Sequence, residues 1–162
     1  MGKPGVFTIS ESSNDFNSQT FRAHDRSHPQ TSQIYAKIDQ LAEELLQHGH
    51  VFDPNLVTRP MSPGETYQSI LCGHSEKLAL AFNLIQPVPP PIIEISKNLR
   101  VCPDCRAYTS ISLRASLNSL GSFVDRAAKL IARLRQCHIV IRDAHRMHHF
   151  YPTGQCSCQD HF

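Results

Sequence analysis

The spacing of apolar residues predicts an amphipathic helix from 31 to about 48. Charged residues occupy one face of this helix, and four apolar residues at helical spacing form the other: Ile34, Ile38, Leu41 and Leu45. Thr31 and Ser32 are expected to cap its start, and Gly49 is expected to end it. The preceding residues, 3–30, are polar with short apolar clusters and favour extended or hairpin structure.

Proline and glycine residues divide the rest of the chain into shorter elements. The expected order is a loop at 50–66, a helical turn at 66–71, a helix at about 76–85, a strand at 91–96, a helix at about 103–120 and a strand at 138–142. Between these last two, Ser122 begins an amphipathic helix whose apolar face holds Val124, Ala128, Ile131 and Leu134. This alternation predicts an α/β fold, a mixed β-sheet sandwiched by helices.

Size and charge narrow the class of protein. With 162 residues and 18.2 kDa the chain fits one globular domain, and its longest apolar run, Leu78 to Ile85, is too short to cross a bilayer. Residues 1–96 carry six Lys and Arg against ten Asp and Glu, whereas residues 97–146 carry ten against three. A basic half is typical of nucleic-acid binding, although solvated helix faces explain it equally well. The residues expected to contact phosphates are Lys97, Arg100, Arg142 and Arg146.

Six cysteines and ten histidines carry more information. Cys102 with Cys105 forms a C-x-x-C motif, and Cys156 with Cys158 forms a C-x-C motif. In a chain this rich in histidine, without the pattern of a secretory signal among these residues, such pairs favour metal over disulfides, which stay the alternative. The two remaining cysteines are expected to be buried, unreactive thiols: Cys72 and Cys137.

His74, Glu76, Cys102 and Cys105 form the pattern H-x-E followed by C-x-x-C, which is typical of zinc-dependent nucleobase deaminases. One imidazole and two thiolates hold zinc tetrahedrally and leave a fourth position for water, whose pKa falls toward ~7. Glu76 can then carry a proton from that water to the pyrimidine ring and on to the leaving amine. Two alternatives stay open: a structural zinc with a fourth protein ligand, and a His74 that only caps a helix beside two buried thiols.

Blocks along the whole chain resemble one known family. They are KPG (3–5), HDRSHPQTSQIYAKIDQLAEEL (24–45), GHSEKLALAFNLI (73–85), ISKNLRVCPDC (95–105), IVIRDAHRMHHF (139–150) and GQCSCQDHF (154–162). In this order they resemble the DYW domain, which ends many pentatricopeptide-repeat RNA-editing proteins of plant organelles. The resemblance runs from Lys3 to Phe162. It implies a single domain with a cytidine-deaminase-like fold that converts cytidine to uridine in single-stranded RNA.

The resemblance also implies how the domain is organised and what it works with. Residues 3–15 correspond to a PG-box entry segment, about 50–72 to a gating-like region, and 143–162 to a zinc-binding C-terminal tail. Two zinc ions per chain are implied, one catalytic and one structural. Target choice would come from an upstream pentatricopeptide-repeat tract or a separate repeat protein, in a mitochondrion or plastid. No membrane partner is expected.

The structural zinc implied by the family would use Cys156 and Cys158, because two thiolates and two imidazoles close a tetrahedron. Arg106 stands where the family usually has a further histidine. The candidate imidazoles are therefore His148, His149 and, as a further possibility, His145. Adjacent residues of a strand point to opposite sides, so the first two would reach one metal together only under strain.

The chain departs from the family pattern in two further places. It ends in Asp160-His161-Phe162 rather than Asp-Tyr-Trp, and the connection around Gly121 is longer than usual. These departures bear on substrate preference more than on chemistry. The alternatives to C-to-U editing are a non-catalytic, zinc-stabilised module that binds RNA or protein to assist an editing partner, and a reverse editor that converts uridine to cytidine.

Overall fold

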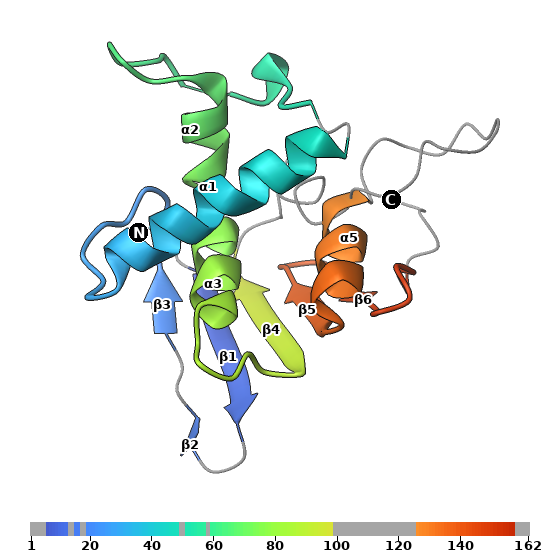
Figure 1. Ribbon diagram of the computed structural model, residues 1–162. Helices are drawn as coiled ribbons and strands as arrows, with labels where there is room; N and C mark the ends of the chain where they lie inside the picture. Colours follow the sequence, from blue (N-terminus) through green and yellow to red (C-terminus); the bar gives the residue numbers. More distant parts are fainter. Residues whose placement is uncertain are drawn as a thin grey trace, which may run out of the picture.

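The computed structural model (Figure 1) describes residues 6–12, 15–16, 19–48, 51–57, 59–98 and 126–157. Within them the elements in chain order are β1 (Val6–Ser12), β2 (Asp15–Phe16), β3 (Gln19–Phe21), α1 (Thr31–Gln47), the 3-10 helix η1 (Pro54–Leu56), α2 (Tyr67–Cys72), α3 (Ser75–Leu84), β4 (Ile92–Lys97), α5 (Arg126–Arg135), β5 (His138–Arg142) and β6 (Met147–Phe150). Strands and helices are interspersed along the chain, which confirms the α/β class.

The described strands form one mixed sheet in the order β2-β1-β4-β5-β6, with β3 paired to β1. β1 is antiparallel to β4, β4 is parallel to β5, and β5 is antiparallel to β6. The register places Ile93 beside Ile139 and Ile139 beside Phe150, so three buried side chains line up across one face. Because side chains alternate along a strand, Ile92 and Glu94 lie on the opposite face, where they are only partly buried.

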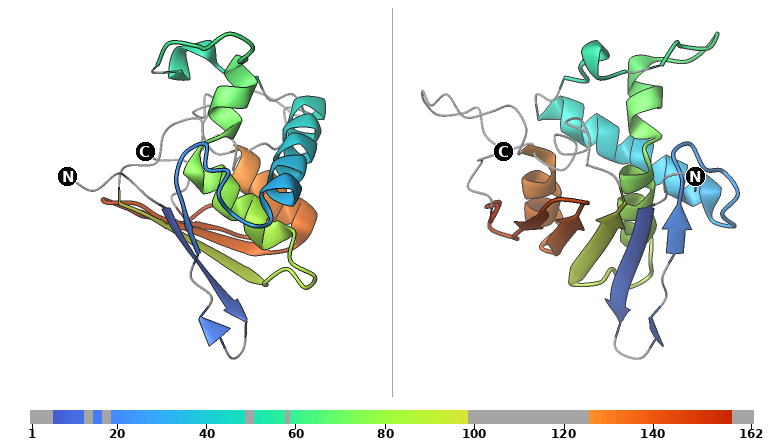
Figure 2. Two further views of the ribbon diagram at one scale, coloured as in Figure 1. Left: turned by 90° about the vertical axis from the view of Figure 1, so that its left-hand side faces the viewer. Right: turned by 180° about the vertical axis from the view of Figure 1, so that it is seen from behind.

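The helices α1, α3 and α5 lie on one side of the sheet, and their buried residues form one core with the isoleucines of β4 and β5 (Figure 2). α3 packs against β1, β3 and β4, α5 packs against β5 and β6, and α1 lies over α3. Every residue of α3 is buried, because neighbours surround it on several sides. The expectation of helices on both faces is not confirmed in the described ranges, where the second face carries no helix.

The first predicted helix is confirmed as α1, with its four expected apolar residues buried. Its predicted cap is wrong. Gln30 occupies the N-cap position without a capping side-chain bond, and Thr31 is already helical. The preceding turn satisfies the backbone instead, since the N–H of Gln30 donates to Nδ1 of His28 at 3.1 Å and the N–H of Thr31 donates to the carbonyl of His28 at 2.9 Å.

The later elements agree with the sequence except at two points. α2, α3, β4 and β5 confirm the predicted elements with only small shifts at their ends, and Thr66 and Ser69 form a reciprocal capping box that starts α2. In α5 the buried stripe runs through Ile131 and Ala132, so Leu134 points outward and is 43% exposed, against expectation. The predicted helix at 103–120 lies outside the described residues. No helix of the described part is long and apolar enough to span a membrane.

The C-terminal tail is more regular than the sequence suggests. Asp143 closes a turn by accepting the backbone N–H groups of His145 and Arg146, each at 2.8 Å. β6 then pairs with β5, and Phe150 pairs in turn with Cys156 through an isolated bridge. Backbone pairing with the sheet therefore orders the tail as far as residue 157.

Candidate metal centre

His74 lies at the N-cap position of α3 and is half-buried. Its backbone begins the helix, because its carbonyl accepts the N–H groups of Lys77 at 3.0 Å and Leu78 at 3.2 Å. Its side chain makes no capping hydrogen bond. His74 thus occupies the cap position through its backbone, and the other half of the helix-cap alternative, Cys102 and Cys105 as buried thiols, lies outside the described residues.

Glu76 lies in the first turn of α3 and is 2% exposed. One carboxylate oxygen, Oε1, accepts a hydrogen bond from the Lys97 ammonium at 2.5 Å, and the other, Oε2, accepts one from the Ser75 hydroxyl at 3.0 Å. Burial by itself raises the pKa of Glu76, but the charge and hydrogen bond of Lys97 outweigh burial and hold the pKa below its ordinary value. Glu76 is therefore ionised at neutral pH, at a helix N-terminus where the macrodipole also favours an anion.

Lys97, at the carboxyl end of β4, is placed differently from the sequence expectation. Its side chain is only 13% exposed and lies against Glu76 rather than facing solvent as a phosphate contact would. Because α3 packs on β4 with its first turn near the end of that strand, the two charges meet across the layers. Arg142 and Arg146 are exposed, as phosphate contacts would be, and Arg100 lies outside the described residues.

His24 is a neighbour of the centre that was not assigned to the site from the sequence, although it opens the resembling block 24–45. Its N–H donates to the carbonyl of Gly73 at 2.6 Å, and its ring covers that glycine so closely that a Cβ there would lie 2.2 Å from Nδ1. His24 itself has a φ of 59°, in the left-handed region. Partial burial, followed by the charges of Arg59 and His74, lowers the pKa of His24. Glycine next to histidine was the available signal, since only glycine permits this approach.

The segment expected to gate access, about 50–72, acts on residues beside the centre in two ways, through the charges of an ion pair and through one ring contact. Arg59 grips Glu65 through two contacts, 2.6 and 2.8 Å, and both charges act on the ring of His24. Hydrogen bonds from Arg59 and from the Ser62 backbone lower the pKa of Glu65 to about 2. Lys77, next to Glu76 and 1% exposed, extends toward Phe52, with its ammonium 5.6 Å from the ring centroid.

The two adjacent histidines of β6 face opposite sides, as a strand requires. His148 is 2% exposed and stacks on Phe150, on the side of the sheet that the helices cover. His149 lies on the uncovered face, where its Nδ1 is 3.3 Å from Nε2 of His138 and its ring lies beside Tyr151. The predicted conflict between the two imidazoles is thereby confirmed.

Cys156 lies on the covered side with His148, because it pairs with Phe150 two residues along β6. It is 7% exposed and disulfide-bonded, and its partner lies outside the described residues. His145 is exposed in the turn before β6. Cys72 and Cys137 are buried thiols outside any disulfide, which confirms their expected burial, and burial raises the pKa of Cys137 to about 11.

The structure brings together part of the predicted catalytic set. His74 and Glu76 adjoin at the start of α3, whereas Cys102, Cys105 and Cys158 lie outside the described residues. Within the described ranges, no group of three or more His, Cys, Asp or Glu side chains could hold a metal. The chemistry available there is one imidazole beside one buried, ionised carboxylate.

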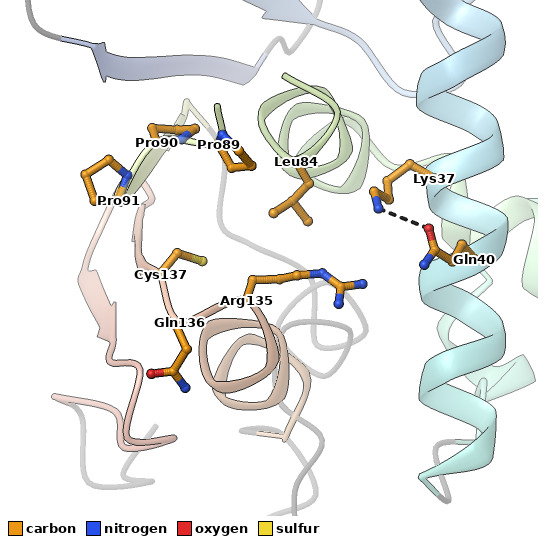
Figure 3. A pocket seen from close by; sticks show the side chains of 9 residues that line it. All are labelled: Lys37, Gln40, Leu84, Pro89, Pro90, Pro91, Arg135, Gln136 and Cys137. Atoms are coloured by element: carbon orange, nitrogen blue, oxygen red, sulfur yellow. Dashed lines mark hydrogen bonds between the residues drawn. The ribbon is translucent and has the colours of Figure 1, made fainter. Parts of the chain in front are cut away.

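A pocket of about 540 Å³ lies away from this centre, at the opposite end of α3 (Figure 3). Lys37 and Gln40 of α1 line one wall and share a hydrogen bond of 3.0 Å, while Arg135 and Cys137 line another. The end of α3 contributes Leu84, ten residues after His74. None of the residues predicted for either zinc or for RNA lines this pocket.

A family model described as the DYW family of nucleic acid deaminases matches residues 49–120 and 112–162. The chain is 37% identical over 158 residues to the Arabidopsis thaliana pentatricopeptide repeat-containing protein ELI1, chloroplastic, covering 98% of this chain and 21% of that protein. Two further pentatricopeptide repeat-containing proteins of Arabidopsis thaliana are similar. At2g27610 is 39% identical over 142 residues, which cover 87% of this chain and 14% of that protein. At5g15340, mitochondrial, is 34% identical over 143 residues, which cover 88% of this chain and 20% of that protein. The chain spans about a fifth or less of the length of these relatives.

Proposed function

Because the chain belongs to the DYW family of nucleic acid deaminases, we propose that it is a zinc-dependent cytidine deaminase that converts cytidine to uridine in single-stranded RNA. The observation that carries this proposal is the position of Glu76, an ionised carboxylate buried two residues after the half-buried His74. Burying a charge is costly, and the ion pair with Lys97 offsets part of that cost. A proton-carrying role in catalysis would explain why the chain keeps a carboxylate at this position.

His74, Cys102 and Cys105 would hold the catalytic zinc. The covalent chain supports their convergence, because Cys102 follows Lys97 by five residues and an extended segment of that length spans at most about 18 Å. Lys97 in turn contacts Glu76 directly. The donor set, one nitrogen and two sulfurs, suits tetrahedral zinc with an open position.

Zinc bound there would lower the pKa of a water molecule and so supply a nucleophile at neutral pH. The Glu76 carboxylate would be the group that takes up a proton and delivers it to the ring nitrogen of cytosine, and it would then carry the second proton of the attacking water to the departing amine. Burial shields this transfer from bulk solvent, since Glu76 is 2% exposed. The cytidine must be unstacked from its neighbours to reach it.

For the second zinc we propose Cys156 and Cys158 with His148, rather than His149, as an imidazole ligand. His148 and Cys156 share the covered side of the sheet, whereas His149 lies on the opposite face, with its ring tilted against that of His138. A disulfide and a zinc site both require sulfur atoms that lie close together. The two can be distinguished by measuring bound zinc in excess reductant, where a disulfide is lost and a zinc site keeps its metal.

The proposed partner is single-stranded RNA, selected by an upstream pentatricopeptide-repeat tract or a separate repeat protein. Relatives named as pentatricopeptide repeat-containing, and as chloroplastic or mitochondrial, support both this partner and an organellar location. The exposed Arg142 and Arg146 are the described residues best placed for phosphates.

The test is metal analysis combined with an RNA deamination assay on wild-type protein and Glu76→Ala. We expect two zinc ions in both proteins, and a loss of C-to-U conversion of at least ~100-fold in the variant, because general acid–base groups contribute roughly 10²–10⁴-fold. Glu94→Ala is the matched control, since this carboxylate lies on the uncovered face of β4. Deamination by Glu76→Ala at the wild-type rate, or wild-type protein without zinc or C-to-U activity, contradicts the proposal.

A further inference from the structure

Lys97 and Glu76 form an ion pair that is largely withdrawn from solvent. The ammonium and carboxylate are 2.5 Å apart, and their side chains are 13% and 2% exposed. They come from different layers, β4 and the first turn of α3, and 20 residues separate them in sequence. Separating the partners of a buried ion pair leaves each charge uncompensated, which is costly. The two groups therefore hold each other in place.

The two oxygens of Glu76 are held in different ways. Oε1 accepts a hydrogen bond from the charged Lys97 ammonium at 2.5 Å, whereas Oε2 accepts one from the neutral Ser75 hydroxyl at 3.0 Å. A charge-assisted bond is roughly twice as strong as a neutral one. The carboxylate is therefore anchored at Oε1 and more easily released at Oε2.

We propose, resting on the deaminase function proposed above, that Lys97 is a positioning residue that fixes Oε1 of Glu76 and so assigns Oε2 as the oxygen that carries the proton. The water proton moves to Oε2 as the Ser75 hydroxyl turns away, and from Oε2 it passes to the cytosine ring nitrogen. Lys97 itself exchanges no proton and touches no substrate. It acts through Glu76 alone.

This role differs from a phosphate contact in what it changes kinetically. A lysine that binds the RNA backbone contributes affinity, so its loss raises KM and reduces the salt dependence of binding. A lysine that orients the proton carrier acts on the chemical step, so its loss lowers kcat and leaves KM in place. The 13% exposure of Lys97 favours the second effect.

The experiment measures kcat and KM on a single-stranded RNA with one editable cytidine, together with zinc content, for the zinc-loaded wild type and three variants. Lys97→Met keeps the length of the side chain and removes its charge. Lys97→Arg keeps the charge, but its forked guanidinium engages both carboxylate oxygens. Lys37→Met, on α1, is the matched control for the loss of an ammonium away from the centre.

We expect Lys97→Met to keep two zinc ions and a KM within about twofold of wild type while kcat falls at least ~10-fold, part of the range for general acid–base catalysis. Lys97→Arg should lower kcat several-fold at unchanged KM, because the guanidinium then also occupies Oε2. If Lys97→Met fails to fold, the Lys97→Arg variant alone decides the test. Raised KM with unchanged kcat, or wild-type values for both constants, overturns the proposal. An inactive wild type contradicts the deaminase function instead.

A second readout needs no activity. In a urea-unfolding cycle on zinc-loaded protein, Lys97→Met and Glu76→Gln each lower the midpoint, and the double variant lowers it by clearly less than the sum of the two shifts. Additive shifts would mean that the two groups do not interact, and would overturn the positioning role whatever the kinetics.

Discussion

The close approach of His24 to Gly73 can be tested by adding a side chain at position 73 and then removing the one at position 24. In Gly73→Ala the new Cβ would lie 2.2 Å from Nδ1 and 3.1 Å from Cγ of His24. The second distance involves the base of the ring, so rotation of the ring plane alone does not remove the clash. The backbone at Gly73 accepts alanine, because its φ is −79° and its ψ is 4°.

The expected loss follows from two opposing effects. Overpacking costs about 1–3 kcal/mol, and the lower part of that range applies because His24 is exposed and can turn toward solvent. Replacing glycine at a compatible φ stabilises by about 0.4–1 kcal/mol through the unfolded chain. Gly73→Ala should therefore lower the free energy of unfolding by about 1 kcal/mol.

The assay is urea unfolding of the zinc-loaded protein, with His24→Gly as the rescuing change. Glycine suits the φ of 59° at position 24 and removes the ring, so the double variant should regain the stability lost in Gly73→Ala. Gly64→Ala is the control, since its φ of 87° strains alanine in open space and His24→Gly should not rescue it. Wild-type stability of Gly73→Ala, or no rescue by His24→Gly, would refute the packing at this position.

Two further predictions concern titrating groups. The Glu65 carboxyl, followed by carbon NMR, should stay ionised down to about pH 2, and the stability that it gives with Arg59 should be present above the ordinary carboxyl pKa and disappear as pH falls through about 2. Titration near pH 4.5 would mean that the grip of Arg59 is absent in solution. Cys137, with a pKa of about 11, should resist iodoacetamide at pH 8 in the native protein and react after unfolding in urea; rapid labelling of the folded protein would contradict its burial.

The elements that the sequence predicts best are those whose pattern is local. The apolar face of α1 follows from residues three and four apart, and β5 agrees with its predicted range, 138–142, at both ends. Thr31 shows the limit. A threonine before an apolar run is a good cap in sequence, but the helix begins one residue earlier, and His28 accepts the N–H groups of Gln30 and Thr31 from the preceding turn. That competition is set by tertiary geometry.

In the candidate site, too, the features set by local sequence were predictable and those set by tertiary packing were not. The H-x-E spacing locates His74 and Glu76 at the start of a helix, since both lie within one turn. The partnership of Glu76 with Lys97 could not be predicted, because it depends on how α3 crosses the end of β4. Charge alone suggested a phosphate contact for Lys97. The burial of the Lys97 side chain, which cannot be inferred from the sequence, indicates that it pairs with the carboxylate.

The tail shows a third case. The alternation of His148 and His149 was predictable from strand geometry, and the structure resolves which of them faces the core. The contact between the rings of His149 and His138 depends on the register between β6 and β5, which the sequence does not specify by itself.

The central claim is that His74 and a pair of thiolates hold zinc with one position left for water beside Glu76. A crystal structure of the zinc-loaded protein, with zinc located by its anomalous signal, tests it most directly. We predict a nitrogen of His74 at about 2.0–2.1 Å and two sulfurs, from Cys102 and Cys105, at about 2.3 Å from one ion. A fourth protein ligand closing that ion, or zinc bound away from His74, would contradict the account.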